Sequence, residues 1–302
     1  MKPENSGLAR TTLEIAKYTE LAGHSVCIKE PGSGMVRWGV PKDPDVHTIH
    51  SQLSADVYFD RKPKFMVQHG EPLSSVGNGV SMKAICDLSS KVDAFICMRK
   101  DEWPIWNSIK RTYLVDKGID LDFYRPEPGT EKLEGEPAIL YLENWRGTRN
   151  PLYLCMAMEK IWQKLPKARL HLYNCRDPKM KETFQALIKN NKWWPFIRSL
   201  SGPVDIKDVN QLYNRADIVV SCLFPLYARS IEAFGAGKAF IGPGYKEHDY
   251  PFQCDLSPDS IAETIIRCWE NYDQVNYREW GEKYHNVENT VKQSLAAYER
   301  YL

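Results

Sequence analysis

The stretch DVNQLYNRADIVVSCLFPLYARSIEAFGAGKAFIGPG, residues 208–244, contains the patterns that decide the fold. Its first eight residues are typical of an amphipathic helix, and DIVVSC (217–222) is a short run that is apolar on both faces. A second short helix, with Glu232 inside it, then leads through two glycines into AFIGPG (239–244). Helix, strand, helix and strand in this order predict a parallel sheet that is covered by helices on both sides.

The same alternation extends outward in both directions. Upstream, after a Pro- and Gly-rich linker candidate at 124–137, come strands and helices that predict a complete doubly wound unit. The further strands expected in that unit are AILYLE (138–143), RLHLYN (169–174) and FIRSLSG (196–202), with helices near 150–164, 178–190, 206–214 and 258–271.

A second alternating set precedes the linker. Its expected elements are a helix over 7–22, strands at SVCIKE (25–30), DVHTIH (45–50), KFMVQH (64–69), DAFICM (93–98) and RTYLVD (111–116), and helices at 80–91 and 101–110. We therefore predict an α/β protein with two Rossmann-like, doubly wound domains facing across a cleft, at residues 1–127 and 128–285. A last helix at 286–302 is expected to pack back on the N-terminal domain. Only MKPENS precedes the first helix, so the first strand usual in such a domain is expected to be missing.

The composition of the chain excludes some classes of function. The chain has 302 residues, of which 43% are hydrophobic, and a formal net charge of +1. This balance gives no reason to expect nucleic-acid binding, and with no long apolar run, membrane association is expected to be peripheral at most. Eight cysteines without a CxxC pair or zinc-ligand spacing predict free, buried thiols in a cytoplasmic protein.

Glu232 is the first candidate site residue. The backbone amides of Leu226, Tyr227 and Ala228 precede its helix and could face a phosphate or a sugar, because the first turn of a helix has free N–H groups. Glu232, one turn further along, could accept hydrogen bonds from vicinal hydroxyls. Alternatively, Glu232 is a solvated helix residue, and the residues alone do not decide between the two.

Several segments, in order, resemble the retaining glycosyltransferases of family 4 (glycosyl transferases group 1), which have the two-domain GT-B fold. SGLARTTLEIAKYTELAGHSVCI resembles the family's glycine loop, first helix and second strand, and VDKGIDLDFYRP resembles its interdomain signature. AILYLENWRGTRNP resembles the first strand and basic loop of the donor domain. The opening stretch resembles the elements that hold the donor nucleotide.

The resemblance implies roles for particular residues. Glu232 falls on the second glutamate of the family's E-x7-E motif, which binds the nucleotide ribose, whereas Phe224 stands where the first glutamate is expected. Arg149, with Arg146 as helper, matches the basic loop that grips the diphosphate; a planar guanidinium can offer paired donors to phosphate oxygens.

On the acceptor side, Gly7 matches the glycine loop that approaches the diphosphate, and His69 matches a histidine close to the reacting sugar. Asp120-Leu121-Asp122 is formally a DxD sequence, but the interdomain turn explains it better than a metal site does. We therefore expect no metal and no cofactor other than the donor substrate.

The resulting hypothesis is a metal-independent, retaining glycosyltransferase that uses a UDP-, GDP- or ADP-linked sugar and an unidentified acceptor: a glycan, a lipid or a small molecule. An epimerase or phosphorylase on the same fold is one alternative. A degenerate relative that only binds a nucleotide or a partner protein is another, and Phe224 is the residue that motivates it. A Rossmann dehydrogenase is disfavoured, because no GxGxxG follows a strand.

Overall fold

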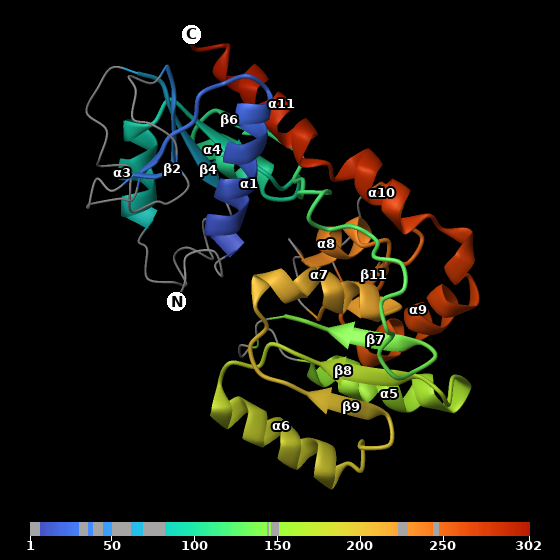
Figure 1. The fold of residues 1–302 in the computed structure, drawn as a ribbon. Helices are drawn as coiled ribbons and strands as arrows, with labels where there is room; N and C mark the ends of the chain where they lie inside the picture. The colour runs from blue at the N-terminus through green and yellow to red at the C-terminus, as the bar shows by residue number, and fades with distance from the viewer. Residues whose placement is uncertain are drawn as a thin grey trace. The chain divides into compact units, whose positions relative to one another are not determined.

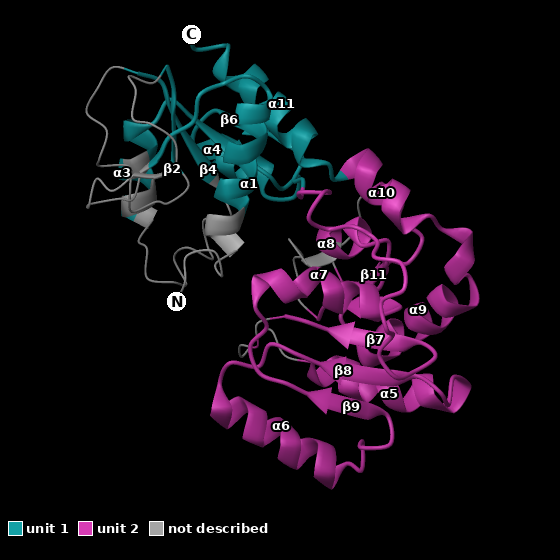
Figure 2. Ribbon diagram, viewed as in Figure 1, with its two compact units in different colours: residues 1–118, 285–302 teal, residues 119–284 magenta. Residues whose placement is uncertain are grey.

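The structure is a computed structural model, and it describes residues 7–29, 36–38, 45–49, 62–68, 82–143, 145, 151–222, 229–243 and 248–302. The chain divides into two compact units: residues 1–118 with 285–302 form unit 1, and residues 119–284 form unit 2 (Figure 2). The boundary expected from the sequence, at 127/128, lies inside unit 2 of this division.

Unit 1 is built on a four-stranded parallel sheet with the strand order β3-β4-β5-β6 (Figure 1). The strands are β3 (His47–Ile49), β4 (Lys64–Gln68), β5 (Ala94–Cys97) and β6 (Thr112–Leu114). β1 (Ile28–Lys29) and β2 (Val36–Trp38) form a separate antiparallel pair. The strand expected over 25–30 is therefore much shorter than predicted, and its described pairing partner is β2.

The helices of unit 1 include one from each end of the chain. They are α1 (Gly7–Leu21), α3 (Met82–Lys91), α4 (Trp103–Ile109) and α11 (Val287–Tyr298). α11 packs against α1 and also contacts the sheet, where the rings of Phe65 and Tyr298 lie 4.7 Å apart. The Thr48 hydroxyl donates a hydrogen bond to the Tyr298 hydroxyl at 3.1 Å. The last helix is thus part of the core of unit 1.

Gly118, the last residue of the first segment of unit 1, lies against the residues that begin the second segment. A Cβ placed on Gly118 would overlap the backbone of Val287 and would lie 2.6 Å from the carbonyl carbon of Asn286. Only glycine leaves room for this approach. The point where the chain leaves unit 1 therefore adjoins the point where it returns.

Unit 2 contains a five-stranded parallel sheet with the order β11-β10-β7-β8-β9. The strands are β7 (Ala138–Tyr141), β8 (Arg169–Leu172), β9 (Ile197–Leu200), β10 (Ile218–Val220) and β11 (Ala239–Ile241). Numbered along the chain, this order is 5-4-1-2-3, the arrangement of a doubly wound nucleotide-binding sheet. The order reverses between β7 and β10.

The helices of unit 2 cover this sheet, and side-chain caps mark where some of them begin. They are α5 (Leu152–Lys164), α6 (Pro178–Asn190), α7 (Ile206–Arg215), α8 (Arg229–Gly235), α9 (Pro258–Glu270) and α10 (Tyr277–Tyr284). Asp177 accepts a hydrogen bond from the Lys179 amide at 2.9 Å, and Ser257 accepts one from the Ser260 amide at 3.2 Å. In both helices a proline follows the cap, which stabilises the first turn.

The predicted fold class is confirmed: the main sheet of each unit is parallel and combines with helices, and strands that are buried on both faces produce the apolar runs in the sequence. Every residue of β5, β7, β10 and β11 is buried. The expected helices at 178–190 and 258–271 match α6 and α9 to within one residue at each end.

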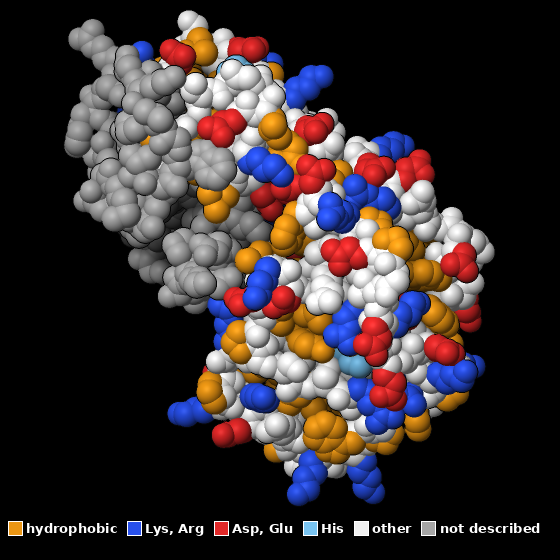
Figure 3. Space-filling model, in the orientation of Figure 1, with side chains coloured by type: hydrophobic (Ala, Val, Ile, Leu, Met, Phe, Trp, Pro, Cys, Tyr) orange, Lys and Arg blue, Asp and Glu red, His pale blue; other side chains and the backbone are white. Residues whose placement is uncertain are grey.

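Charges on the described surface are mixed. On the face shown in Figure 3, basic and acidic side chains are interspersed, in keeping with the net charge of +1. Within the described residues, no helix combines the length and the apolar character needed to span a bilayer. All eight cysteines are free, and six of them are buried; Cys27 is half-buried and Cys86 is exposed.

Candidate functional site

The reversal of strand order between β7 and β10 marks the candidate site, because open parallel sheets bind ligands beyond the carboxyl ends of their strands at such a point. Glu143 follows β7 and Ser221 follows β10. Both are buried, at 6% and 1% exposure, and the Ser221 hydroxyl donates a hydrogen bond to Glu143 Oε1 at 3.1 Å. A carboxylate and a hydroxyl therefore lie side by side at the reversal.

Glu232 lies in α8, the helix that follows β10. Its exposure is 0%, and its Oε2 accepts a 2.7 Å hydrogen bond from the hydroxyl of Tyr213, a fully buried residue of α7. The interpretation of Glu232 as a solvated helix residue is therefore wrong. A buried carboxylate requires hydrogen-bond donors, and Tyr213 supplies one of them.

The same helix, α7, also holds the segment through which the chain enters unit 2. Asn210 and Asn214 lie one turn apart on α7, on either side of Tyr213 along the helix. Asn210 accepts from the Arg125 amide and donates to its carbonyl, both at 3.2 Å. Asn214 accepts from the Glu127 amide at 2.7 Å and donates to the Arg125 carbonyl at 2.9 Å. The two side-chain amides thus bind the backbone of 125–127 as a neighbouring strand would.

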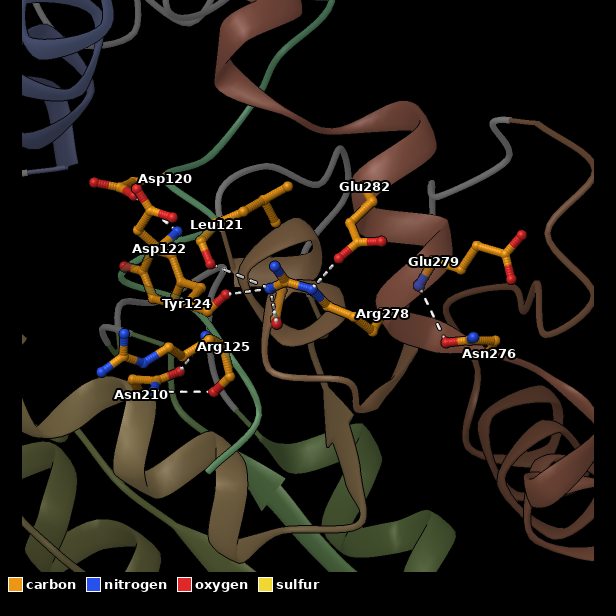
Figure 4. A network of polar contacts seen from close by, with 11 residues as sticks. Asp120, Leu121, Asp122, Tyr124, Arg125, Asn210, Asn276, Arg278, Glu279 and Glu282 are labelled. Atoms are coloured by element: carbon orange, nitrogen blue, oxygen red, sulfur yellow. Dashed lines mark hydrogen bonds and ion pairs between the residues drawn. The ribbon is translucent and has the colours of Figure 1, made fainter. Parts of the chain in front are cut away.

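Arg278 of α10 connects this segment to the end of α8 (Figure 4). Its Nη1 donates to the backbone carbonyls of Leu121 at 3.2 Å, Tyr124 at 2.7 Å and Gly235 at 2.6 Å. Its Nε donates to Glu282 at 2.7 Å. The guanidinium of Arg278 therefore connects three parts of the chain: the turn at 121–124, the end of α8, and its own helix α10.

Two glycines make this junction possible. A Cβ on Gly235 would lie 2.6 Å from Tyr124 Cβ, and a Cβ on Gly281 would lie 3.2 Å from Phe234 Cβ. Gly237, two residues after α8, adopts a φ of +72°, a conformation that suits glycine. Of the two glycines that follow Glu232 in the sequence, Gly235 thus serves close packing against Tyr124, and Gly237 serves a turn with positive φ.

Of the predicted site residues, the structure places Glu232 and the start of α1. Gly7 is the first residue of α1 and belongs to unit 1. The other predicted site residues lie outside the described part of the chain; they are His69, Arg146, Arg149, Leu226, Tyr227 and Ala228.

Asp120 has a structural role in the turn where the DxD sequence occurs. It is 7% exposed, and its Oδ1 accepts hydrogen bonds from the amides of Asp122 at 3.0 Å and Phe123 at 3.1 Å. This is a side chain that closes a local turn. Among the described residues, no group of His, Cys, Asp and Glu has the arrangement of a metal site.

The thiols near the reversal are unsuited to nucleophilic chemistry. Cys222 follows Ser221, and burial raises its pKa to about 12; burial also raises the pKa of Cys155 on α5. Because only the thiolate is a good nucleophile, both groups are inert near neutral pH.

Sequence reasoning missed Glu143, Ser221 and Tyr213. The first two had a usable signal, since each is the polar residue that follows the apolar core of a predicted strand, in AILYLE and DIVVSC. Tyr213 had none, because its partner is 19 residues away on another helix.

Comparison with known proteins identifies solved structures that have a similar fold. No protein-family model and no curated protein sequence matches the chain. Among solved structures, a glycosyltransferase from Rickettsia africae is similar with a TM-score of 0.69 at 16% identity, covering 97% of this chain and 94% of that one. Sucrose-phosphate synthase from Thermosynechococcus elongatus is similar with a TM-score of 0.67 at 17% identity, covering 84% and 72%.

A third similar structure is Anabaena HepE in complex with UDP-glucose. Its TM-score is 0.67 at 15% identity, covering 99% of this chain and 85% of that one. At these identities the likeness concerns the fold, which is that of the GT-B glycosyltransferases, with two Rossmann-like units.

Proposed function

We propose that this chain, which has the GT-B fold, is a glycosyltransferase that moves a sugar from a nucleotide-diphosphate donor to an acceptor hydroxyl. The observation that carries the proposal is Glu232, a fully buried carboxylate in the helix that follows β10 of unit 2, hydrogen-bonded by Tyr213 at 2.7 Å. Solved complexes of the similar HepE contain UDP and UDP-glucose, which supports a nucleotide sugar as the donor.

In this proposal the donor binds to unit 2. Glu232 accepts hydrogen bonds from the ribose hydroxyls, which are donors that a carboxylate can pair with. Arg149, with Arg146, binds the diphosphate, together with the backbone amides of residues 226–228. The positive charge of the two arginines and the N–H dipoles of these amides stabilise the diphosphate as it departs, so the reaction needs no metal ion.

The reaction breaks the bond between the anomeric carbon and the diphosphate oxygen. The acceptor oxygen forms the new bond to that carbon on the face that the diphosphate vacates, so the anomeric configuration is retained. The acceptor proton leaves with the nucleoside diphosphate. His69 and Gly7 are the proposed contacts near the reacting sugar and the diphosphate.

One observation favours a second candidate. Phe224 stands eight residues before Glu232, where the resemblance predicts a glutamate, and a phenyl ring cannot accept a hydrogen bond from a sugar hydroxyl in the way a carboxylate does. A relative that binds a nucleotide without transferring a sugar would tolerate this residue.

The first test is a thermal-shift panel with UDP, GDP and ADP and with their glucose or mannose derivatives. The proposal expects one nucleotide to raise the melting temperature in a concentration-dependent way, because a ligand that binds only the folded state stabilises it. Release of that nucleoside diphosphate in the presence of an acceptor mixture would distinguish a transferase from a binding protein. Lack of stabilisation by every nucleotide would refute the donor site.

Glu232→Gln tests the residue assignment. The amide keeps the shape of the side chain but removes its charge, so nucleotide affinity should fall by roughly tenfold, in the range for a lost charged hydrogen bond. Glu263→Gln, an exposed position on α9, is the matched control and should leave the affinity unchanged. Isothermal calorimetry measures both; equal affinities for the two variants would remove Glu232 from the site.

A further inference from the structure

A second buried carboxylate lies in unit 2 outside the set of residues assigned above. Glu143 is 6% exposed and follows the central strand β7. Its Oε1 accepts a hydrogen bond from the Ser221 hydroxyl at 3.1 Å. Ser221, itself 1% exposed, follows β10, which pairs with β7 in parallel register from Ile218 to Val220.

The polar partner of Glu143 is unusual for a buried acid. Buried carboxylates are commonly paired with a cation, because removing a charge from water is costly. Within the described part of the chain, no Lys or Arg forms an ion pair with Glu143, and a single neutral hydroxyl binds it. A carboxylate has room for about four hydrogen bonds, so further donors can be added by a ligand.

The position of Glu143 restricts what that ligand can be. It lies at the reversal of strand order, where ligands of open parallel sheets bind beyond the strand ends. A diphosphate would be repelled by a carboxylate there, since like charges at short distance are unfavourable. A group with several neutral O–H donors, such as a sugar ring, satisfies the carboxylate without adding charge.

We propose that Glu143, held in place by Ser221, accepts hydrogen bonds from hydroxyl groups of the donor's sugar and so selects the sugar that is transferred. This inference rests on the proposed function and names the part of the donor that Glu143 contacts. Glu143 also supplies a hydrogen-bond acceptor for the donor's sugar in a chain whose residue 224 is phenylalanine. This carboxylate follows β7, whereas the family's glutamate would lie eight residues before Glu232.

The test compares affinities for a nucleoside diphosphate and for the matching nucleotide sugar, using whichever of UDP/UDP-glucose, GDP/GDP-mannose and ADP/ADP-glucose stabilises the wild-type protein. Calorimetry is carried out on the wild type, Glu143→Gln, Glu143→Met and Ser221→Ala. Glutamine keeps an acceptor without the charge, whereas methionine keeps only the volume. Glu263→Gln is the control.

The expected result is a selective loss. Affinity for the nucleotide sugar should fall by about tenfold in Glu143→Met and by less in Glu143→Gln and Ser221→Ala, while affinity for the nucleoside diphosphate stays within a factor of about two. Equal losses for both ligands, no loss for either, or tighter binding of the nucleoside diphosphate would each overturn the inference. The Ser221→Ala variant keeps Glu143 and so remains informative if a change at Glu143 prevents folding.

Failure of this inference differs from failure of the proposed function. If the wild-type protein binds none of the six ligands, the donor site itself is refuted and the role of Glu143 falls with it. If the wild type binds and the ratio of the two affinities is the same in all variants, the donor site stands and only the sugar contact is refuted.

Discussion

Tyr213 determines how the carboxylate of Glu232 is held. Its ring is fully buried on α7, so its hydroxyl has little freedom to choose another partner, and it donates to Glu232 Oε2 at 2.7 Å. Tyr213 lies on the helix that precedes β10, and Glu232 lies on the helix that follows it. The carboxylate therefore has a defined orientation before any ligand arrives.

Tyr213→Phe removes the hydroxyl and keeps the ring. We expect the free energy of unfolding to fall by about 1–3 kcal/mol, because a buried acceptor loses a donor, and nucleotide affinity should fall as well. Tyr153→Phe, at an exposed position on α5, is the control. Urea unfolding and calorimetry give the two quantities, and a variant that matches the control in both would show that the hydrogen bond does not orient Glu232.

At the scale of single residues, the sequence singled out Glu232 as a candidate but did not predict its burial or its hydrogen bond with Tyr213. The amphipathic pattern around Glu232 leaves open which side of the short helix faces the sheet. The contact with Tyr213, and the meeting of Glu143 with Ser221, depend on which strands are neighbours, a property of sheet order that local patterns do not contain.

The junction of α8, α10 and the segment 121–127 depends on Arg278. Arg278→Met keeps much of the aliphatic volume but removes donors to three backbone carbonyls. We expect the unfolding free energy to fall by about 1–3 kcal/mol, the effect of leaving partly buried acceptors unpaired. Thermal and urea unfolding of the full-length chain measure this change.

Glu282→Gln is the matched control for this junction. It removes only the ion pair of Arg278 with a carboxylate that is 52% exposed, so it should change stability by less than about 1 kcal/mol. If Arg278→Met were as stable as Glu282→Gln, the carbonyl contacts would have no measurable role in stability.

His171 makes the stability of unit 2 depend on pH. Its ring in β8 lies between the Ser199 hydroxyl, at 3.0 Å from Nδ1, and the Glu134 carbonyl, at 2.7 Å from Nε2. Burial lowers the pKa of His171 below its usual value. The unfolded chain therefore binds the proton at a higher pH than the folded chain does, and stability is lost as the pH falls below about 6.5.

The measurement is the melting temperature between about pH 7.5 and pH 5.5, compared for the wild type, His171→Gln and the exposed control His24→Gln. We expect a shallower decline with falling pH in His171→Gln than in the other two proteins. The same slope in all three would show that His171 does not contribute to the pH dependence.

At the scale of elements, the parallel strands and most helices were predictable because parallel strands are buried on both faces and produce continuous apolar runs. β1 was predicted as a longer strand over 25–30, and β2 was not predicted, since a strand of two or three residues leaves too short a pattern to recognise. α10 was also missed: Tyr277, Trp280 and Tyr284 recur at helical spacing, but an eight-residue helix provides only about two turns of that pattern.

For the molecule as a whole, unit 1 depends on the C-terminal segment. α11 contributes Val287, Val291 and Ala297 to its buried clusters, and Tyr298 packs on Phe65. Deleting residues 285–302 should destabilise unit 1 by at least about 3 kcal/mol, the effect of losing one large buried side chain. Unit 2, whose core runs from Ile119 to Tyr277, should keep its stability and its affinity for nucleotide.

Scanning calorimetry of the truncated chain would show this as a transition that moves to lower temperature beside one that does not move. Loss of both transitions together would contradict the independence of the two cores.

The contact of Gly118 with Asn286 and Val287 has a consequence for how such a protein can be rebuilt. Because the chain leaves and returns at adjacent points, unit 2 is topologically an insert in a loop of unit 1, and the host is closed without it. A segment equivalent to residues 119–284 from another protein of this fold could be grafted at the same two peptide bonds without stretching the host. Exchange of unit 2 for the equivalent unit of another protein at this position is therefore a practical route for engineering chimaeras.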